Sequence, residues 1–166
     1  MKLLVNVKGV PVEHVLVIAC GNSLRSDDGI AWQAAEAIRR NLPDIAKVFC
    51  VQQLTPELAE DVALADLVIF LDASAKGEPG NIDCDAVFAE SSLLHFSHHL
   101  APTEVLDVCA RLYSAKPRAF LISVHGQCFE HGDELSPVAV HAVPKVVAEV
   151  CKLMERSAEH RVDLAR

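Results

Sequence analysis

The pattern of apolar and polar positions predicts strands that alternate with helices. Four continuous apolar runs have the length of a strand, as expected for parallel strands that are covered on both faces. These runs lie at 14–20, 47–51, 67–72 and 118–124. Residues 81–88 instead alternate apolar and polar side chains, which predicts a half-buried edge strand. Residues 2–7 are a further, short candidate for an edge strand.

Between these strands, apolar residues recur at helical spacing. The predicted helices cover 28–42, 55–64, 102–112 and a last segment that starts at Pro137. Pro144 predicts a break or kink in the last one. This alternation predicts a single α/β domain over residues 1–166, with a twisted, mostly parallel sheet of about five strands and helices on both faces. Residues 1–13 and 157–166 would be peripheral.

Composition narrows the class of protein. Of the 166 residues, 51% are hydrophobic and 23% are charged, which suits one globular domain with a sizeable core. The formal net charge of -8 would repel a phosphate backbone, so we expect no nucleic-acid partner. No apolar run approaches the roughly 18 residues needed to span a bilayer, so we expect no membrane insertion. The six cysteines are widely spaced and form no CxxC pair, which favours a reducing, cytoplasmic setting.

Several polar residues follow the first predicted strand, in the segment CGNSLRSDDG at 20–29. The glycine-asparagine pair permits a sharp turn. Ser26 is a candidate N-cap for the helix that follows. Asp27 and Asp28 would then lie in its first turn, where a negative charge faces the positive end of the helix dipole. These two acids therefore have a structural interpretation as well as a chemical one.

Asp72 directly follows the most strand-like run of the chain. In open α/β sheets, ligands bind at the carboxyl ends of the strands, and the loop that carries Asp28 leaves the carboxyl end of another strand. We therefore expect the two carboxylates to meet at one edge of the sheet. An ordinary cap or turn residue is the alternative for Asp72, although a carboxylate is costly to bury without a partner.

A histidine from a distant loop would complete this pair. His98 and His99 precede the third predicted helix, and an imidazole with two carboxylates forms an open site for a divalent transition metal. A surface role is the alternative for such a histidine. His125, Cys128 and His131 have a spacing that could hold zinc but lack a fourth ligand, and a loop that leaves a strand is the favoured alternative for them. The chain has no HExxH helix, GxSxG elbow or Walker loop.

Five segments, in this order, resemble the hydrogenase maturation proteases. They are VLVIACGNSLRSDDGIA, QLTPEL, LVIFLDAS with the following GEPG, SHHLAPTEVL and FEHGDELSPVAVHAVP, and the similarity runs from about residue 14 to 152. The resemblance implies a twisted sheet flanked by helices. It also implies an endopeptidase that removes the C-terminal extension of a nickel-iron hydrogenase large-subunit precursor after nickel has been inserted.

The resemblance also implies the site residues. The family's acidic metal-contacting positions fall on Asp28 and Asp72, and its histidine falls on His98. Nickel would be carried by the precursor, with no organic cofactor, and the protein is expected to be a monomer. Ala19 and Ala31 stand where the family often has glycine, which tightens the first loop. Secondary candidates are Asn22, Asp27 and His99.

The resulting hypothesis is that both carboxylates and His98 approach a nickel ion held by the precursor. A water polarised by the metal or by a carboxylate would then cut the peptide bond. One alternative is a non-catalytic nickel-binding maturation chaperone that uses the same ligands. Another is a nucleotide-binding module with phosphate at the first helix, which the negative charges of Asp27 and Asp28 disfavour.

Overall fold

The computed structural model describes residues 14–42, 46–90 and 100–164, with side chains described to residue 157. Its strands are β1 (Val15–Cys20), β2 (Ala46–Val51), β3 (Leu67–Ser74), β4 (Ile82–Val87) and β5 (Arg118–His125). They form one five-stranded sheet in the order β2-β1-β3-β5-β4. All neighbouring strands are parallel except β4, which pairs antiparallel with β5 at the edge. The predicted edge strand at 81–88 is thus confirmed.

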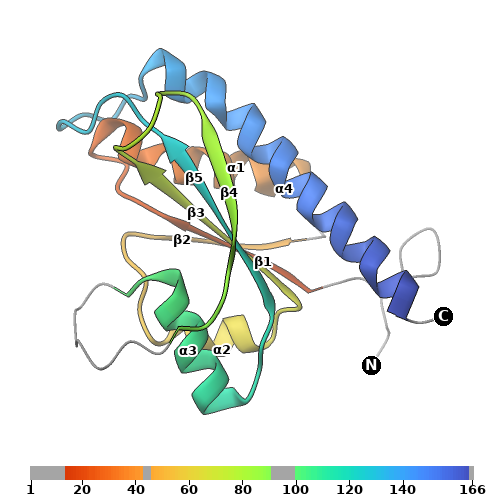
Figure 1. Cartoon of the computed structure of the whole chain (residues 1–166). Coiled ribbons are helices and arrows are strands. Elements are labelled where there is room, and N and C mark those ends of the chain that lie inside the picture. The colour runs from red at the N-terminus through yellow and green to blue at the C-terminus, as the bar shows by residue number, and fades with distance from the viewer. Residues whose placement is uncertain (1–13, 43–45, 91–99, 165–166) are drawn as a thin grey trace.

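Helices cover both faces of the sheet (Figure 1). On one face lie α1 (Ile30–Asn41) and α4 (Pro137–Leu164), and on the other lie α2 (Leu58–Ala63) and α3 (Pro102–Tyr113). A short 3-10 helix, η1 (Ser26–Gly29), directly precedes α1. The predicted fold class, a single α/β domain with a mostly parallel sheet, is confirmed.

The hydrophobic core has two layers because successive side chains of a strand point to opposite faces. In β1, Val15 and Val17 pack under α1 and α4, whereas Leu16 and Ile18 pack under α2 and α3. All four are at most 5% exposed. Burying a Val, Leu or Ile side chain stabilises the fold by about 1.5–3 kcal/mol. The continuous apolar runs in the sequence therefore follow from strands that are covered twice.

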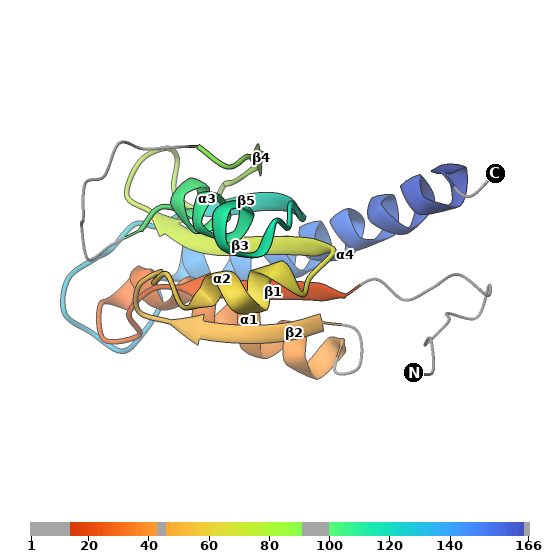
Figure 2. The ribbon, with the colours of Figure 1, turned by 90° about the horizontal axis from the view of Figure 1, so that it is seen from below.

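The carboxyl ends of the parallel strands lie together at one side of the molecule. Figure 2 shows the arrowheads of β2 and β3 at this side, together with the loops that leave β1, β3 and β5. β3 continues to Ser74, so Asp72 lies within the strand and does not end it as predicted. The last two residues of β3 pair with Val124 and His125 of β5, which explains the extension.

Two helices differ from the prediction. α2 is shorter than expected, since the chain from Thr55 forms a turn before the helix begins at Leu58. α4 runs through Pro144 as one helix, so of the predicted break or kink the break is absent. The residues around the proline, Ala142 and Val146, are fully buried against the core, and this packing stabilises the helix despite the missing backbone donor.

Other predictions lie outside the described residues, namely the candidate strand at 2–7 and the histidines His98 and His99. All six cysteines are free thiols. No described helix has both the length and the apolar composition needed to cross a membrane.

Candidate functional site

The first loop turns sharply as it leaves β1, as the glycine-asparagine pair predicts. Gly21 has a φ of +153, and a Cβ at this position would clash with the backbone carbonyl oxygen of Asp28. The side chain of Asn22 accepts a hydrogen bond from the backbone of Leu24 over 2.9 Å. The backbone amide of Asn22 donates a hydrogen bond to Asp28 Oδ2 over 3.0 Å. The turn therefore folds the loop back on itself and fixes the Asp28 carboxylate.

The two alanines at family glycine positions fit this arrangement. Ala19 and Ala31 are both 0% exposed and belong to the core layer under α1 and α4. Their methyl groups thus fill space in the core.

Asp27 is a structural anchor at the centre of the loop. Its side chain is 0% exposed, and its carboxylate accepts hydrogen bonds from the amides of Gln127 (2.7 Å), Cys128 (3.0 Å) and Ser136 (2.7 Å). The Ser136 hydroxyl donates a fourth, over 2.7 Å. Burial alone raises the pKa of Asp27, but the hydrogen bonds from Cys128, Ser136 and Gln127 together hold this pKa below its usual value.

These contacts correct two predictions about the loop. Ser26 is not an N-cap, because its backbone has a φ of 48 and its hydroxyl donates to the Glu130 carbonyl over 3.0 Å. Asp27 does not face the dipole of the first helix. Its carboxylate instead binds the start of α4 through Ser136 and the loop that follows β5. As a secondary site candidate, Asp27 therefore holds the site together and has no exposed surface for a ligand.

Asp28, next to the anchor, is only partly buried and lies near Asp72. The Asp72 carboxylate accepts the amide of Ala73 through Oδ1 over 2.9 Å. The Asp72 side chain is exposed at the surface of the sheet edge, but neighbouring protein atoms still displace part of its solvent, and the negative charge of Asp28 adds to this effect. Together they raise the pKa of Asp72 to about 6, although the Ala73 hydrogen bond acts in the opposite direction. The structure thus brings together the two carboxylates that the sequence placed at one edge.

Cys20, the last residue of β1, lies between the loop and the sheet and was not a predicted site residue. Burial, followed by the charges of Asp72 and Asp28, raises the pKa of its thiol to about 11. The thiol lies 3.6 Å from the Gln52 carbonyl oxygen, which accepts its hydrogen bond. At neutral pH the thiol is therefore protonated and a poor nucleophile. The sequence signal that could have identified Cys20 as a site residue is its position directly before the glycine-asparagine turn.

The loop after β5 is a second part of the site that the sequence did not predict. Arg25 and Gly132 form an isolated β-bridge, and Gly132 accepts the Ser26 amide over 2.8 Å. The Asp27 amide donates to the Cys128 carbonyl over 2.9 Å. The bonded residues are about one hundred positions apart in the sequence, so only the three-dimensional structure shows that the loop after β5 supports the loop after β1.

A third metal ligand is not provided by the described part of the chain. Within it, no group of three His, Cys, Asp or Glu side chains could hold a metal ion. The predicted third ligand, His98, lies outside the described residues, as does His99. The alternative zinc set is not assembled, because the His125 side chain pairs with Asp83 over 2.9 Å instead.

The raised pKa of Asp72 predicts a stability cost at neutral pH. Between the ordinary value of 3.8 and about 6, the folded protein binds more protons at Asp72 than the unfolded chain does. Stability therefore falls as the pH rises through this window. Asp72→Asn should unfold at a higher temperature than the unsubstituted protein, by a margin that grows from about pH 4 to about pH 7. Calorimetry over this range measures the margin.

Asp85→Asn, on β4, controls for the loss of one exposed carboxylate. A margin for Asp72→Asn that is the same at all pH values, or that matches the Asp85→Asn margin, would contradict this prediction.

Comparisons with known proteins were made against sequences and structures. No protein-family model matches the sequence, and no curated protein matches it. Solved structures do match. The hydrogenase maturating endopeptidase HybD from E. coli is 23% identical, with a TM-score of 0.69 over 87% of this chain and 93% of that chain. The chain shares its fold.

Two archaeal structures give similar values. The [NiFe] hydrogenase maturation protease HycI from Thermococcus kodakarensis is 19% identical, with a TM-score of 0.68 over 86% of this chain and 93% of that chain. The hydrogenase 2 maturation peptidase from Thaumarchaeota archaeon is 23% identical, with a TM-score of 0.64 over 86% and 99%. The likeness extends over nearly the whole of each chain, so the shared fold is that of the complete domain.

Proposed function

We propose that the protein is an endopeptidase that removes the C-terminal extension from a nickel-iron hydrogenase large-subunit precursor. The observation that carries this proposal is the pair of carboxylates, Asp28 and Asp72, held near one another at the carboxyl edge of the sheet. The likeness of the fold to hydrogenase maturation endopeptidases supports it. So do the five sequence segments that resemble that family.

In this proposal the metal belongs to the substrate. Asp28 and Asp72 contact a nickel ion held by the precursor, with His98 as the third contact. Carboxylate and imidazole donors suit a divalent transition metal and leave positions open. When bound, such an ion polarises a carbonyl group and lowers the pKa of water. The enzyme thereby acts only on precursors that already contain metal.

The residues of the chain have separate roles. The Asn22 amide orients the Asp28 carboxylate. In the protein alone the pKa of Asp72 is raised to about 6; beside the nickel ion, a carboxylate oxygen that does not contact the metal would accept the proton of the attacking water. Because the Cys20 thiol is kept protonated, we assign the attack on the peptide bond to water and not to a covalent intermediate.

Purified protein and precursor test the proposal directly. The protein should shorten a nickel-loaded precursor, and intact mass should show the loss of one C-terminal peptide. The metal-free precursor should retain its full mass, since metal contact licenses cleavage. Equal cleavage of both forms would contradict recognition through nickel. Binding of the loaded precursor without shortening would favour the non-catalytic chaperone.

A further inference from the structure

His125 lies at the carboxyl end of β5, on the same face of the sheet as Asp72. Residues that pair across neighbouring strands point to the same face. Asp72 pairs with Ser123, and Ser123 also pairs with Asp83 of β4. One step further toward the carboxyl edge, Ser74 pairs with His125. A row of polar residues therefore crosses β3, β5 and β4 beside the candidate site.

The backbone around His125 holds both ends of the loop that joins β3 to β4. The His125 amide donates to the Asn81 carbonyl over 2.9 Å, and the His125 carbonyl accepts the Gly80 amide over 2.8 Å. The Gly126 amide donates to the Ser74 carbonyl over 2.9 Å. The loop that begins two residues after Asp72 is thus tied down at its first and last residues.

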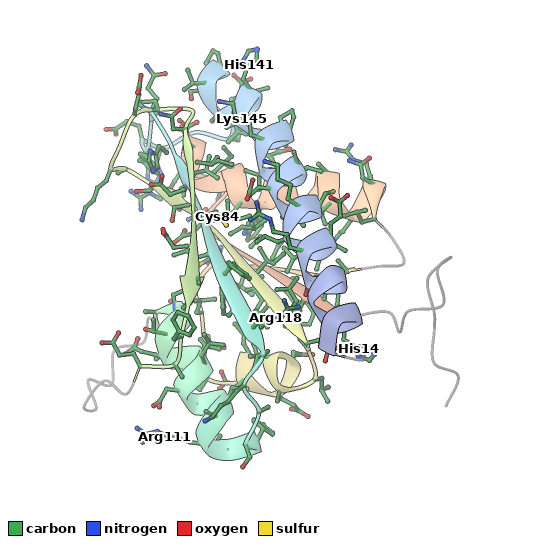
Figure 3. The ribbon with its side chains drawn as sticks, turned by 45° about the vertical axis from the view of Figure 1, so that its right-hand side comes forward. His14, Cys84, Arg111, Arg118, His141 and Lys145 are labelled. Carbon is green, nitrogen blue, oxygen red and sulfur yellow. The ribbon has the colours of Figure 1, made fainter. Side chains whose placement is uncertain are left out.

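The imidazole ring of His125 supports the middle of this loop. Gly77 has a φ of +91, and a Cβ at this position would clash with the ring. On its other side the ring is fixed by Asp83, whose Oδ2 lies 2.9 Å from Nε2. From α4, Lys145 Nζ donates to the Gly80 carbonyl over 2.8 Å. Figure 3 shows Lys145 near the beginning of α4, at the same end of the molecule as the loop.

Packing alone does not explain a histidine at this position. The His125 side chain is 11% exposed, and its Nδ1 is buried with no hydrogen-bond partner among the residues that the structure describes. The ionised Asp83 carboxylate can only accept, so Nε2 is the donor of this hydrogen bond and Nδ1 is the ring nitrogen that it leaves unpaired. A buried polar atom without a partner costs free energy that an apolar ring of the same size would avoid. The hydrogen bond to Asp83 is what the histidine adds.

We propose that His125, held by Asp83, is a positioning residue for Asp72, because it fixes the loop through which the chain leaves the Asp72 end of β3. This inference rests on the endopeptidase function proposed above. Since the ring cannot turn while Asp83 holds Nε2, Gly77 keeps its place above the ring. The end of β3 is then pinned, and the Asp72 carboxylate keeps its orientation against the Ala73 amide.

Substitutions at both ends of the pair test this role. His125→Phe keeps a ring beneath Gly77 and removes the donor, whereas His125→Gln keeps a donor for Asp83. Asp83→Asn weakens the same hydrogen bond from the other side. We expect His125→Phe and Asp83→Asn to lower kcat on nickel-loaded precursor by about 10- to 100-fold with KM unchanged. His125→Gln should recover part of this loss.

The matched control is Asp85→Asn, which removes an exposed carboxylate from the same strand and should keep kcat unchanged. The amide resonance of Ala73 provides a readout that does not require cleavage, since this amide donates to Asp72 Oδ1. It should shift in His125→Phe and Asp83→Asn but not in the control. Thermal unfolding identifies any variant that does not fold, and Asp83→Asn carries the test if His125→Phe is lost.

Unchanged kcat in His125→Phe and Asp83→Asn would overturn the proposal. If the unsubstituted protein does not shorten the precursor, the proposed function fails, but the Ala73 amide resonance still tests whether His125 positions Asp72. A resonance that does not shift in either variant would then overturn the positioning role.

Discussion

Replacing Asp28 or Asp72 by Ala should stop the shortening of nickel-loaded precursor, with a fall in rate of at least about 100-fold for each variant. Each carboxylate is assigned a contact to the reacting centre, and neither can substitute for the other, since Asp28 lies in η1 and Asp72 lies in β3. Folding should change little. Asp28 accepts one backbone hydrogen bond in the loop, from Asn22, and such a bond contributes about 1 kcal/mol. Intact mass of the large subunit over time measures the rate.

Asp133→Asn is the matched control, because Asp133 is an exposed carboxylate in the supporting loop after β5. It should cleave at the unsubstituted rate. Normal shortening by both alanine variants would refute the assignment of the site. Loss of shortening together with retained binding of the precursor would locate the defect in the chemical step.

Replacing Asp27 by Ala should have the largest effect on stability. Three partly buried backbone amides and the Ser136 hydroxyl would lose the fully buried carboxylate that is their common acceptor. Leaving one buried donor without a partner costs about 1–3 kcal/mol, and breaking a buried charged network costs about 3–5 kcal/mol. We expect the free energy of unfolding to fall by about 3–5 kcal/mol. Denaturant unfolding followed by circular dichroism measures it.

The neighbouring substitution Asp28→Ala is the control, with an expected loss of about 1 kcal/mol. Ser136→Ala should cost less than Asp27→Ala, and the double variant should cost less than the sum, because both residues belong to one network. Equal losses for Asp27→Ala and Asp28→Ala would contradict the anchor role.

Asp27 also predicts how stability depends on pH. Its pKa in the folded protein is held below the ordinary value of 3.8. The unfolded chain therefore binds more protons at Asp27 than the folded protein as the pH falls below that value. The contribution of Asp27 is complete above this range and is lost as the pH falls through its folded pKa. Asp72 acts in the opposite sense, since its raised pKa makes the folded state less stable as the pH rises toward about 6.

The sequence was informative about the site wherever a local pattern carried the signal. The apolar run before Asp72 predicted a buried strand, and the glycine-asparagine turn predicted a loop at the carboxyl end of another. Together they indicated that Asp28 and Asp72 approach one another, and the structure places them so. The same local reasoning failed for Ser26, which has the residue type of an N-cap but bonds to the Glu130 carbonyl instead.

The sequence by itself determined where along the chain the strands lie, that helices cover both faces of the sheet, and at which edge of the sheet Asp28 and Asp72 lie. Strands and their buried faces require apolar side chains at regular spacings along the backbone, so a short stretch of sequence is enough to reveal them. The family resemblance placed the site at Asp28, but only the tertiary structure gives the physical reason why Asp28, and not the adjacent Asp27, is open to it. Asp27 turns inward because the amides of Gln127, Cys128 and Ser136 converge on it. Asp28 is then the carboxylate whose charge acts on Asp72. Those partners come from the far end of the chain, and nothing in the spacing of two consecutive acids could distinguish one from the other.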